Sequence, residues 1–150
     1  MGFRLTAEEA WADIAAAHTG VLATLRRDGR PVALPVWHVV LDERIYVRTP
    51  RWSKKVGRIA HDARGSFMVE SGLAWAELRA VVLPVRAALV DGDLAARAVA
   101  AIDAKYADYV LPARDAAPSV RAAYADMAVI ELAPDGDFRT WDNAALVGRG

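Results

Sequence analysis

Strand-like segments joined by tight turns run through most of this 150-residue chain. Short apolar and β-branched runs, such as Val21–Leu25, alternate with turn dipeptides, which include Asp28-Gly29, Asp42-Glu43 and Ser71-Gly72. An Asp-Gly pair between two such runs is a strong hairpin signal. Strands joined by tight turns run antiparallel, because a parallel pair needs a crossover of a dozen or so residues. The pattern therefore predicts an antiparallel sheet.

Helical patterns are fewer and lie between the strands. Thr6-Ala7-Glu8-Glu9 has the form of a capping box and predicts a helix that ends near Gly20. Further helices are expected from Ser53, from Leu94 to about Tyr109, and in a short segment ending near Asp126. No internal repeat or linker interrupts the chain. We expect one domain over residues 1–150, mainly β or α+β, built as an antiparallel barrel with peripheral helices.

Three strand segments carry more specific expectations. Pro31–Leu41 is apolar on both alternating sides, which predicts burial on two faces at a barrel wall or an interface, and Pro35 implies a bulge or an edge there. The stretch Glu77–Val90 is expected to break at Pro84. Val129–Leu132 and Phe138–Trp141 flank a Pro-Asp-Gly turn and look like a closing hairpin.

Charge and composition exclude several classes of function. Nineteen basic residues balance nineteen acidic ones, which disfavours a nucleic-acid coat or a polybasic membrane anchor. No cysteine is present, so disulfides, thiolate metal sites and a cysteine nucleophile are excluded. We see no signal peptide and no apolar run near the ~20 residues that span a bilayer. These features predict a soluble, cytoplasmic protein without nucleic-acid or membrane partners.

One local segment departs from this charge balance. Arg44–Arg58 holds six basic residues and no acidic residue. It is predicted to form a strand over Ile45–Arg48, a turn at Thr49-Pro50 and a helix with Ser53 as its N-cap. A hydroxyl cap and free backbone N–H groups, followed at once by Lys54 and Lys55, suit a phosphate. The alternative is a solvated helix start whose lysines only aid solubility.

The same region resembles a known family. The resemblance lies in the segments G-V-L-A-T-L-R-R-D-G-R-P-V-A-L-P-V-W-H-V-V and R-I-Y-V-R-T-P-R-W-S-K-K-V-G-R-I-A-H-D-A-R-G-S-F-M-V-E. They are similar to the pyridoxamine 5′-phosphate oxidase-like family of flavin-binding split barrels. The similarity covers Gly20–Glu70 and continues more loosely through Glu77–Asp91 and Thr140–Asp142. It implies a six-stranded split barrel that forms a homodimer and binds flavin mononucleotide (FMN) between its subunits.

The resemblance also implies a cofactor site. The residues expected to hold the phosphate are Thr49, Ser53, Lys54 and Lys55. Those expected to line the isoalloxazine and ribityl groups are Pro35, Val36 and Trp37 on one strand and Tyr46, Val47 and Arg48 on the next. The chain would then be a flavin-dependent oxidoreductase acting on a small molecule, with no catalytic side chain assigned.

The sequence departs from the family pattern at several positions, and alternatives to an FMN-dependent oxidoreductase remain open. Arg58-Ile59 stands where many relatives have Asn-Leu, and the C-terminal Arg/His signature of the true pyridoxamine phosphate oxidases is not found, so vitamin B6 oxidation is not expected. The alternative cofactor is the 8-hydroxy-5-deazaflavin coenzyme, whose phosphate would use the same helix start. Two rival hypotheses are a non-enzymatic binder of flavin, haem or bile pigment, and an interaction domain that has lost its ligand.

Aromatic and histidine residues are open to two interpretations. Trp37, Trp75 and Trp141 could pack on a planar ring or at a dimer interface, although each taken singly is expected in the core. His38 is expected to be a hydrogen-bonded core residue rather than a proton donor. No histidine pair with a carboxylate shows metal-ligand spacing, so no metal site is expected.

Overall fold

The computed structural model describes residues 4–147. The helices are α1 (Ala7–Ala16), α2 (Lys54–His61), α3 (Gly92–Lys105) and α4 (Pro118–Ala123). The strands are β1 (Gly20–Leu25), β2 (Pro31–Val36), β3 (Val39–Leu41), β4 (Arg44–Pro50), β5 (Arg64–Ser71), β6 (Arg79–Val90), β7 (Met127–Pro134) and β8 (Arg139–Asp142). Short 3-10 turns span Trp75–Glu77, Ala113–Asp115 and Asn143–Leu146.

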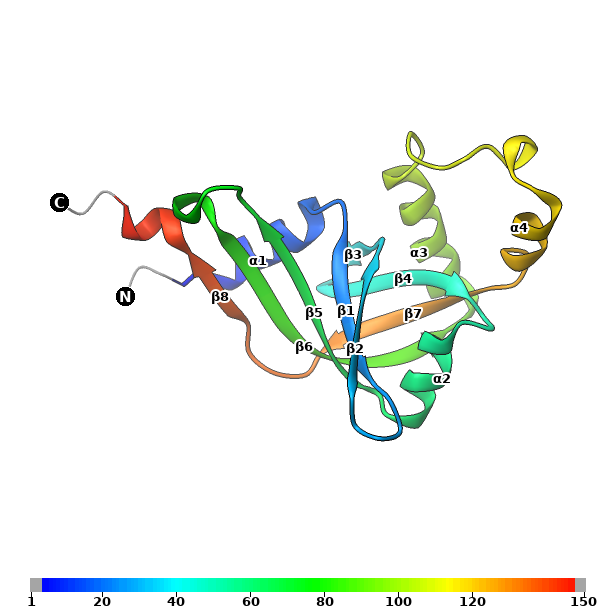
Figure 1. Cartoon of the computed structure of the whole chain (residues 1–150), viewed down its shortest axis with the longest axis horizontal. Coiled ribbons are helices and arrows are strands. Elements are labelled where there is room, and N and C mark those ends of the chain that lie inside the picture. The colour runs from blue at the N-terminus through cyan, green and yellow to red at the C-terminus, as the bar shows by residue number, and fades with distance from the viewer. Residues whose placement is uncertain (1–3, 148–150) are drawn as a thin grey trace.

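The strands of the described chain form one antiparallel sheet that curls back on itself (Figure 1). Its order is β2-β1-β5-β6-β7-β4-β3, and β8 pairs with β6. The two edge strands, β2 and β3, are consecutive in the sequence, with Trp37 and His38 between them. A sheet whose ends are joined by so short a link must close almost into a barrel, yet β2 and β3 do not pair with each other. The fold is therefore a split barrel, as the sequence predicts, with eight strands instead of six.

Local sequence signals explain where these elements begin and turn. The Thr6 hydroxyl accepts from the Glu9 N–H at 3.1 Å, and the Glu9 carboxylate accepts from the Thr6 N–H at 2.7 Å, which confirms the capping box. Asp42 and Glu43 have φ values of 51° and 55°, as the two-residue turn between β3 and β4 requires. Helix α1 ends at Ala16, before the predicted end.

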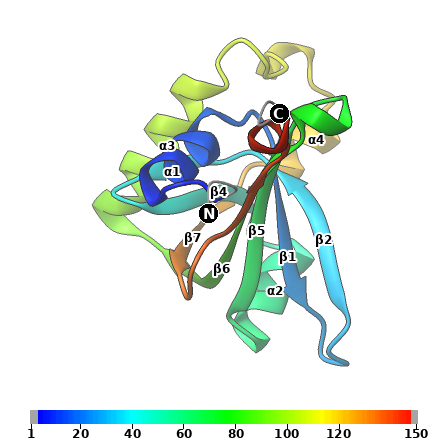
Figure 2. The ribbon, with the colours of Figure 1, turned by 90° about the vertical axis from the view of Figure 1, so that its left-hand side faces the viewer.

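The apolar side chains form two clusters, one on each side of β4. One cluster fills the curled sheet and includes Ile14 of α1, Ile59 of α2 and Phe67 of β5. The other joins α3 to β3, β4 and β7 around Ile102 and Tyr106. Figure 2 shows α1 and α3 together on one side of the sheet, with α2 apart from them. Helix α2 is thus held by its own apolar stripe and presents its remaining faces to solvent.

The structure corrects the expectation that Pro31–Leu41 is one strand buried on both faces. The segment is two strands, and β2 lies at an edge of the sheet, as Pro35 indicates. Pro31, Ala33 and Pro35 are exposed because no other element of the described chain covers that face. The tryptophans expected in the core are also exposed, with Trp37 at 37%, Trp75 at 63% and Trp141 at 44%.

Two predictions about the later strands are wrong, and both errors concern β6. This strand runs unbroken through Pro84, which lies between the part of β6 paired with β8 and the part paired with β7. Its missing N–H is therefore not needed by a ladder, while its carbonyl accepts from Asp135 N–H at 2.8 Å. The predicted closing hairpin does not form, because β7 and β8 pair with opposite ends of β6 and not with each other.

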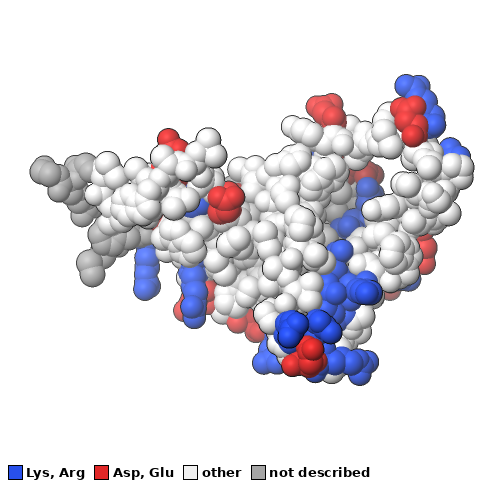
Figure 3. All heavy atoms as spheres, viewed as in Figure 1, with Lys and Arg blue, Asp and Glu red and all other residues white. Residues whose placement is uncertain are grey.

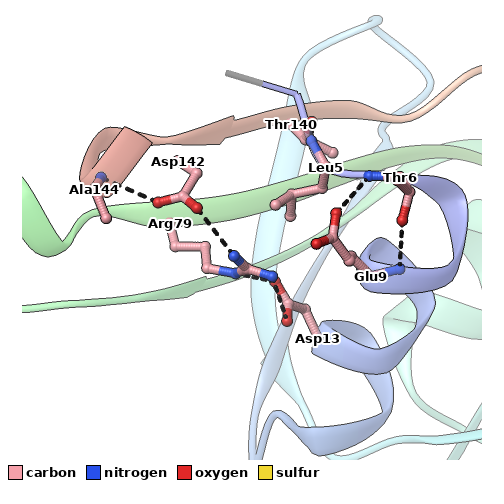
Figure 4. Close-up of polar contacts among 8 residues, drawn as sticks. All are labelled: Leu5, Thr6, Glu9, Asp13, Arg79, Thr140, Asp142 and Ala144. Atoms are coloured by element: carbon pink, nitrogen blue, oxygen red, sulfur yellow. Dashed lines mark hydrogen bonds and ion pairs between the residues drawn. The ribbon is translucent and has the colours of Figure 1, made fainter. Parts of the chain in front are cut away.

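Ion pairs connect β6 with α1 and β8 (Figure 4). The guanidinium of Arg79 donates to both carboxylate oxygens of Asp13, at 2.6 and 3.2 Å, and to Asp142 at 3.1 Å. Nearby, the Leu5 N–H donates to the Thr140 hydroxyl at 3.0 Å. These contacts bind the N-terminal segment and the last strand to the same end of the sheet.

Candidate functional site

Helix α2 begins with a sharp turn of the chain after β4. The Ser53 N–H donates to the Pro50 carbonyl at 2.9 Å, and the Ser53 hydroxyl caps the helix by accepting from the Lys55 N–H at 3.3 Å. This confirms Ser53 as the N-cap. The first turn of α2 carries no acidic residue, whereas the first turn of α1 carries Glu8 and Glu9. Helix α2 therefore begins with positive charge on a terminus that is already positive.

Tertiary structure divides the six cations of the basic segment into two groups. Three are paired with acids from distant parts of the chain, in the pairs Arg44–Glu131 at 2.8 Å, Arg48–Asp103 at 3.0 Å and Arg51–Asp126 at 3.1 Å. Within residues 4–147, Lys54, Lys55 and Arg58 make no ion pair. The cations without a counter-charge are thus those on α2 itself.

Two of these α2 cations line a hollow of about 800 Å³ between α2 and the β1–β2 turn. It is lined by Leu25, Arg26, Arg27, Asp28, Val32, Lys54, Gly57, Arg58 and His61. Lys54, Arg58 and His61 share one stripe of the helix, because residues four and seven positions apart lie on the same face. Figure 3 shows the basic side chains gathered over this part of the surface. We call this the basic hollow.

Arg58 and Lys55 are held in different surroundings. The Arg58 Nε donates to the buried Thr24 hydroxyl at 2.9 Å, which fixes its guanidinium beside β1. Lys55 is half-buried and does not line the basic hollow. Burial, and secondarily the charge of Arg58, lowers the pKa of the Lys55 ammonium. An anion near the helix start would offset both effects.

A second hollow, of about 690 Å³, lies between α3, α4 and the end of β4. Its lining is mainly apolar and aromatic, and comprises Trp37, Arg48, Ile102, Tyr109, Val110, Leu111, Ala116, Val120, Arg121, Tyr124 and Met127. Its volume lies in the range of small-molecule sites. We call this the aromatic hollow.

The indole of Trp37, at one edge of the aromatic hollow, is held from behind. Its ring stacks on Tyr106 with centroids 4.4 Å apart and an interplanar angle of 2°, and the His18 ring meets both edge-on. The Tyr106 hydroxyl donates to the His18 carbonyl at 2.7 Å and accepts from the His38 N–H at 2.9 Å. Trp37 is therefore a fixed, partly exposed aromatic surface.

The residues predicted to bind a cofactor do not all converge. Trp37 and Arg48 line the aromatic hollow, and Lys54 lines the basic hollow. Val36, Tyr46, Val47 and Thr49 are buried, while Pro35 is exposed at the edge strand. The Tyr46 hydroxyl donates to Glu131 at 2.9 Å, and burial together with that carboxylate raises the pKa of Tyr46 to about 12. The side chains of Tyr46 and Val47 thus pack within the protein.

The sequence is also similar to that of a known protein family. The sequence model described as pyridoxamine 5′-phosphate oxidase matches residues 6–136. The chain belongs to the pyridoxamine 5′-phosphate oxidase family. No curated protein matches the sequence.

Solved structures of similar proteins share the fold of this family member. The conserved hypothetical protein Rv2991 from Mycobacterium tuberculosis is 24% identical, with a TM-score of 0.81 over 99% of this chain and 91% of that one. A haem-binding protein from Mycobacterium smegmatis is 25% identical, with a TM-score of 0.66 over 95% of this chain and 60% of its own. An FAD-binding protein from M. smegmatis is 20% identical, with a TM-score of 0.65 over 92% and 97% of the two chains.

Several residues of the two hollows were not singled out from the sequence. Arg26 and Arg27 looked like ordinary turn residues, and only the packing of α2 on β1 brings them opposite Lys54. Tyr109 and Tyr124 come from the segment after α3, which has little periodic pattern. The signal that the sequence did offer is the absence of acidic residues from the first turn of α2.

His38 is a core residue, as predicted. It is fully buried, its Nε2 lies 2.6 Å from the Ile14 carbonyl, and its ring meets Phe67 edge-on. Among the described residues no group of histidine and acidic side chains could hold a metal ion, and no helix is long and apolar enough to cross a membrane.

Proposed function

We propose that this protein is a flavin-dependent oxidoreductase that binds FMN with its phosphate at the start of α2. The observation that carries the proposal is the first turn of α2, which has Ser53 as its cap, Lys54 and Lys55 in the first turn, and no acid. Solved structures of the fold include FAD-binding proteins, which supports a flavin in particular. The proposed phosphate ligands are Thr49, Ser53, Lys54 and Lys55.

The charge arrangement at this helix is unfavourable without a ligand. Two lysines at the positive end of the helix dipole each cost roughly 0.3–1 kcal/mol when exposed. In α1 and α3 the first turn carries acids, which are Glu8 and Glu9 in α1 and Asp93 in α3. A bound phosphate would supply the missing negative charge and accept from first-turn N–H groups. Local departures from stabilising rules of this kind are typical of functional sites.

The ring system would lie toward the aromatic hollow. Trp37 offers a fixed aromatic surface there, and Arg48 contributes a cation from β4. The side chains of Tyr46 and Val47 are buried, so contacts from this part of β4 would come from Arg48 and the backbone. When bound, the flavin would supply hydride transfer through its ring. The protein's part is to hold the phosphate, stack the ring and leave room for a small substrate.

The proposed active form is a homodimer. Strand β2 is an edge strand whose outer residues Ala33 and Pro35 are apolar and exposed. Trp75 and Trp141 are also exposed at the β8 end of the molecule. Exposed apolar surface of this kind commonly marks an interface, and a second copy would cover it.

An absorption spectrum and a titration test the cofactor. We expect the purified protein to show the visible bands of a bound flavin, or to acquire them on titration with FMN; an intense Soret band would indicate haem instead. Lys54→Glu/Lys55→Glu should weaken FMN binding by about 100-fold or more, since it replaces attraction with repulsion at the phosphate. Arg97→Glu/Arg139→Glu, with the same charge change outside both hollows, should not. Unchanged FMN affinity in the lysine variant would refute the proposal.

The deazaflavin coenzyme is the alternative cofactor. It would use the same helix start, so the lysine variant cannot separate it from FMN. Parallel titrations with the two cofactors do so by their affinities. Turnover of reduced cofactor with a panel of small electron acceptors then separates an enzyme from a carrier.

A further inference from the structure

A long connection between α3 and β7 forms much of the aromatic hollow. It comprises residues 107–126 and includes α4, and it arches away from the sheet, in yellow, in Figure 1. Most of the residues that line the aromatic hollow belong to it, among them Tyr109, Leu111 and Tyr124. We call residues 107–126 the strap. The position of the strap therefore sets the size of the aromatic hollow.

The strap contributes little to the core of the protein. Apart from Ala116 and Ala123, every strap residue whose burial is described is exposed. Hydrogen bonds described along its middle are local, such as the one from the Asp115 N–H to the Pro112 carbonyl at 2.8 Å. Helix α4 has six residues, fewer than the ~12–15 that an isolated helix needs. A segment with so little buried apolar surface opens at a low cost in free energy.

Two residues of the turn before α2 hold the end of the strap. The Trp52 indole Nε1 donates to the carbonyl of Ala123, the last residue of α4, at 2.9 Å. The Arg51 N–H donates to the Asp126 carbonyl at 3.0 Å, and the Arg51 Nε donates to the Asp126 carboxylate at 3.1 Å. Trp52 is 70% exposed, so it adds little to the core. What it provides is a partner for a helix-end carbonyl that α4 itself cannot satisfy.

The same turn leads directly into the proposed phosphate site. Arg51 and Trp52 immediately precede Ser53, whose N–H donates to the Pro50 carbonyl at 2.9 Å and closes the turn around them. A phosphate held at Ser53 and the first-turn N–H groups would fix the backbone of this turn, and with it the directions of the Arg51 and Trp52 side chains. Each link to the strap is exposed and weak by itself. Ordering of the turn is therefore enough to shift the strap.

We propose that Arg51 and Trp52 are positioning residues through which a phosphate at the start of α2 closes the strap over the aromatic hollow. This inference rests on the proposed function, from which it takes the phosphate site. The phosphate binds more tightly when the strap is closed, and by linkage the strap is more often closed when the phosphate is bound. Binding of the anionic end of the ligand thus prepares the wall that meets its ring.

Hydrogen–deuterium exchange read by mass spectrometry tests this inference, with inorganic phosphate as the ligand. Phosphate has no ring that could touch the strap, so an effect there must pass through the protein. In the wild type, saturating phosphate should slow exchange in residues 53–58, and should slow it by about five-fold or more in residues 107–126, relative to chloride at equal ionic strength. Lys54→Glu/Lys55→Glu should lose both effects.

Variants of the turn separate the coupling from phosphate binding. Trp52→Phe keeps an aromatic ring but lacks the N–H donor, and Arg51→Ala lacks the guanidinium. In each, the phosphate effect on residues 107–126 should fall below about two-fold, while the effect on residues 53–58 persists. Trp75→Phe, which changes an exposed tryptophan outside the turn, should respond as the wild type does.

The outcomes distinguish this inference from the proposed function. If phosphate slows exchange in residues 53–58 but not in residues 107–126, the inference is wrong and the phosphate site stands. A full strap response in both Trp52→Phe and Arg51→Ala also overturns the inference alone. If neither phosphate nor FMN slows exchange in residues 53–58, the proposed function fails, and the inference with it.

Discussion

Trp37 and Tyr106 stack face to face, with ring centroids 4.4 Å apart and planes inclined by 2°. Trp37 belongs to the link between the two edge strands, and Tyr106 caps the end of α3. The pair therefore fastens a helix to the point where the barrel is split. It also holds the partly exposed face of Trp37 in a fixed direction over the aromatic hollow.

The first prediction concerns the Tyr106 hydroxyl. Tyr106→Phe should lower the free energy of unfolding by about 1–3 kcal/mol, because it leaves the His38 N–H buried without its 2.9 Å acceptor. Tyr109→Phe is the matched control, since Tyr109 is 62% exposed and should lose less than about 0.5 kcal/mol. Urea denaturation measures both. Equal effects would show that the hydroxyl contacts do not contribute.

The second prediction is an acid-side loss of stability from His38. Burial lowers its pKa from 6.5 to about 4, so the unfolded chain takes up a proton that the folded protein does not as pH falls through this range. The contribution is fully present above pH 6.5 and about 3 kcal/mol should be lost on going to pH 4. His38→Gln should be less stable at neutral pH but flatter over that range. If the free energy of unfolding of His38→Gln falls as steeply with pH as that of the wild type, other groups cause the loss.

The third prediction is that one substitution at the start of α2 stabilises the protein without ligand and weakens FMN binding. Lys54→Glu should raise the free energy of unfolding without ligand by about 0.5–1 kcal/mol at low salt, since an acid suits the helix start and can pair with Arg58 four residues on. The same variant should bind FMN more weakly. Arg97→Glu, in the middle of α3, should give no such gain. A destabilised Lys54→Glu protein would show that the lysine has a structural role.

The fourth prediction concerns Arg79. Arg79→Gln should destabilise the protein by about 1–3 kcal/mol, because Asp13 and Asp142 then share a half-buried site without a cation. Arg79→Lys should recover only part of this, since an ammonium cannot donate to Asp13 in two-pronged geometry. Thermal melts of the three proteins test the order. If Arg79→Lys is as stable as the wild type, the charge of Arg79 accounts for the whole effect and its two-pronged geometry contributes nothing.

The fifth prediction tests the proposed dimer. Ala33→Glu and Pro35→Glu place a carboxylate on the exposed face of edge strand β2 and should convert dimers to folded monomers. Ala100→Glu, on the exposed side of α3, should leave the assembly intact. Sedimentation velocity gives the masses, and circular dichroism verifies folding. A wild-type protein that sediments as a monomer at micromolar concentration would contradict the proposal.

Much of the fold could be predicted from the sequence because the signals for it are local. The capping box at Thr6 and Glu9, the cap at Ser53 and the turn at Asp28-Gly29 involve residues within a few positions of one another. Their geometry follows from backbone hydrogen bonding alone. The antiparallel class followed from the tight turns. The cationic start of α2 was visible for the same reason, since three consecutive residues define it.

Pairing between segments that are distant in the sequence could not be predicted from such local signals. Pro84 looked like a break until β7 and β8 were seen to share β6 on either side of it. The basic segment looked uniform until Asp103, Asp126 and Glu131 paired with its arginines.

The sequence alone determined the antiparallel class, the caps of α1 and α2, and the lysine pair without acids at the start of α2, because each depends on neighbours along the chain. Only the tertiary structure decided which cations remain unneutralised and that Arg26 and Arg27 face Lys54. Coulombic attraction depends on distance in space, and folding sets that distance without regard to separation in sequence. The same isolated run of six basic residues could thus have been wholly neutralised in another fold.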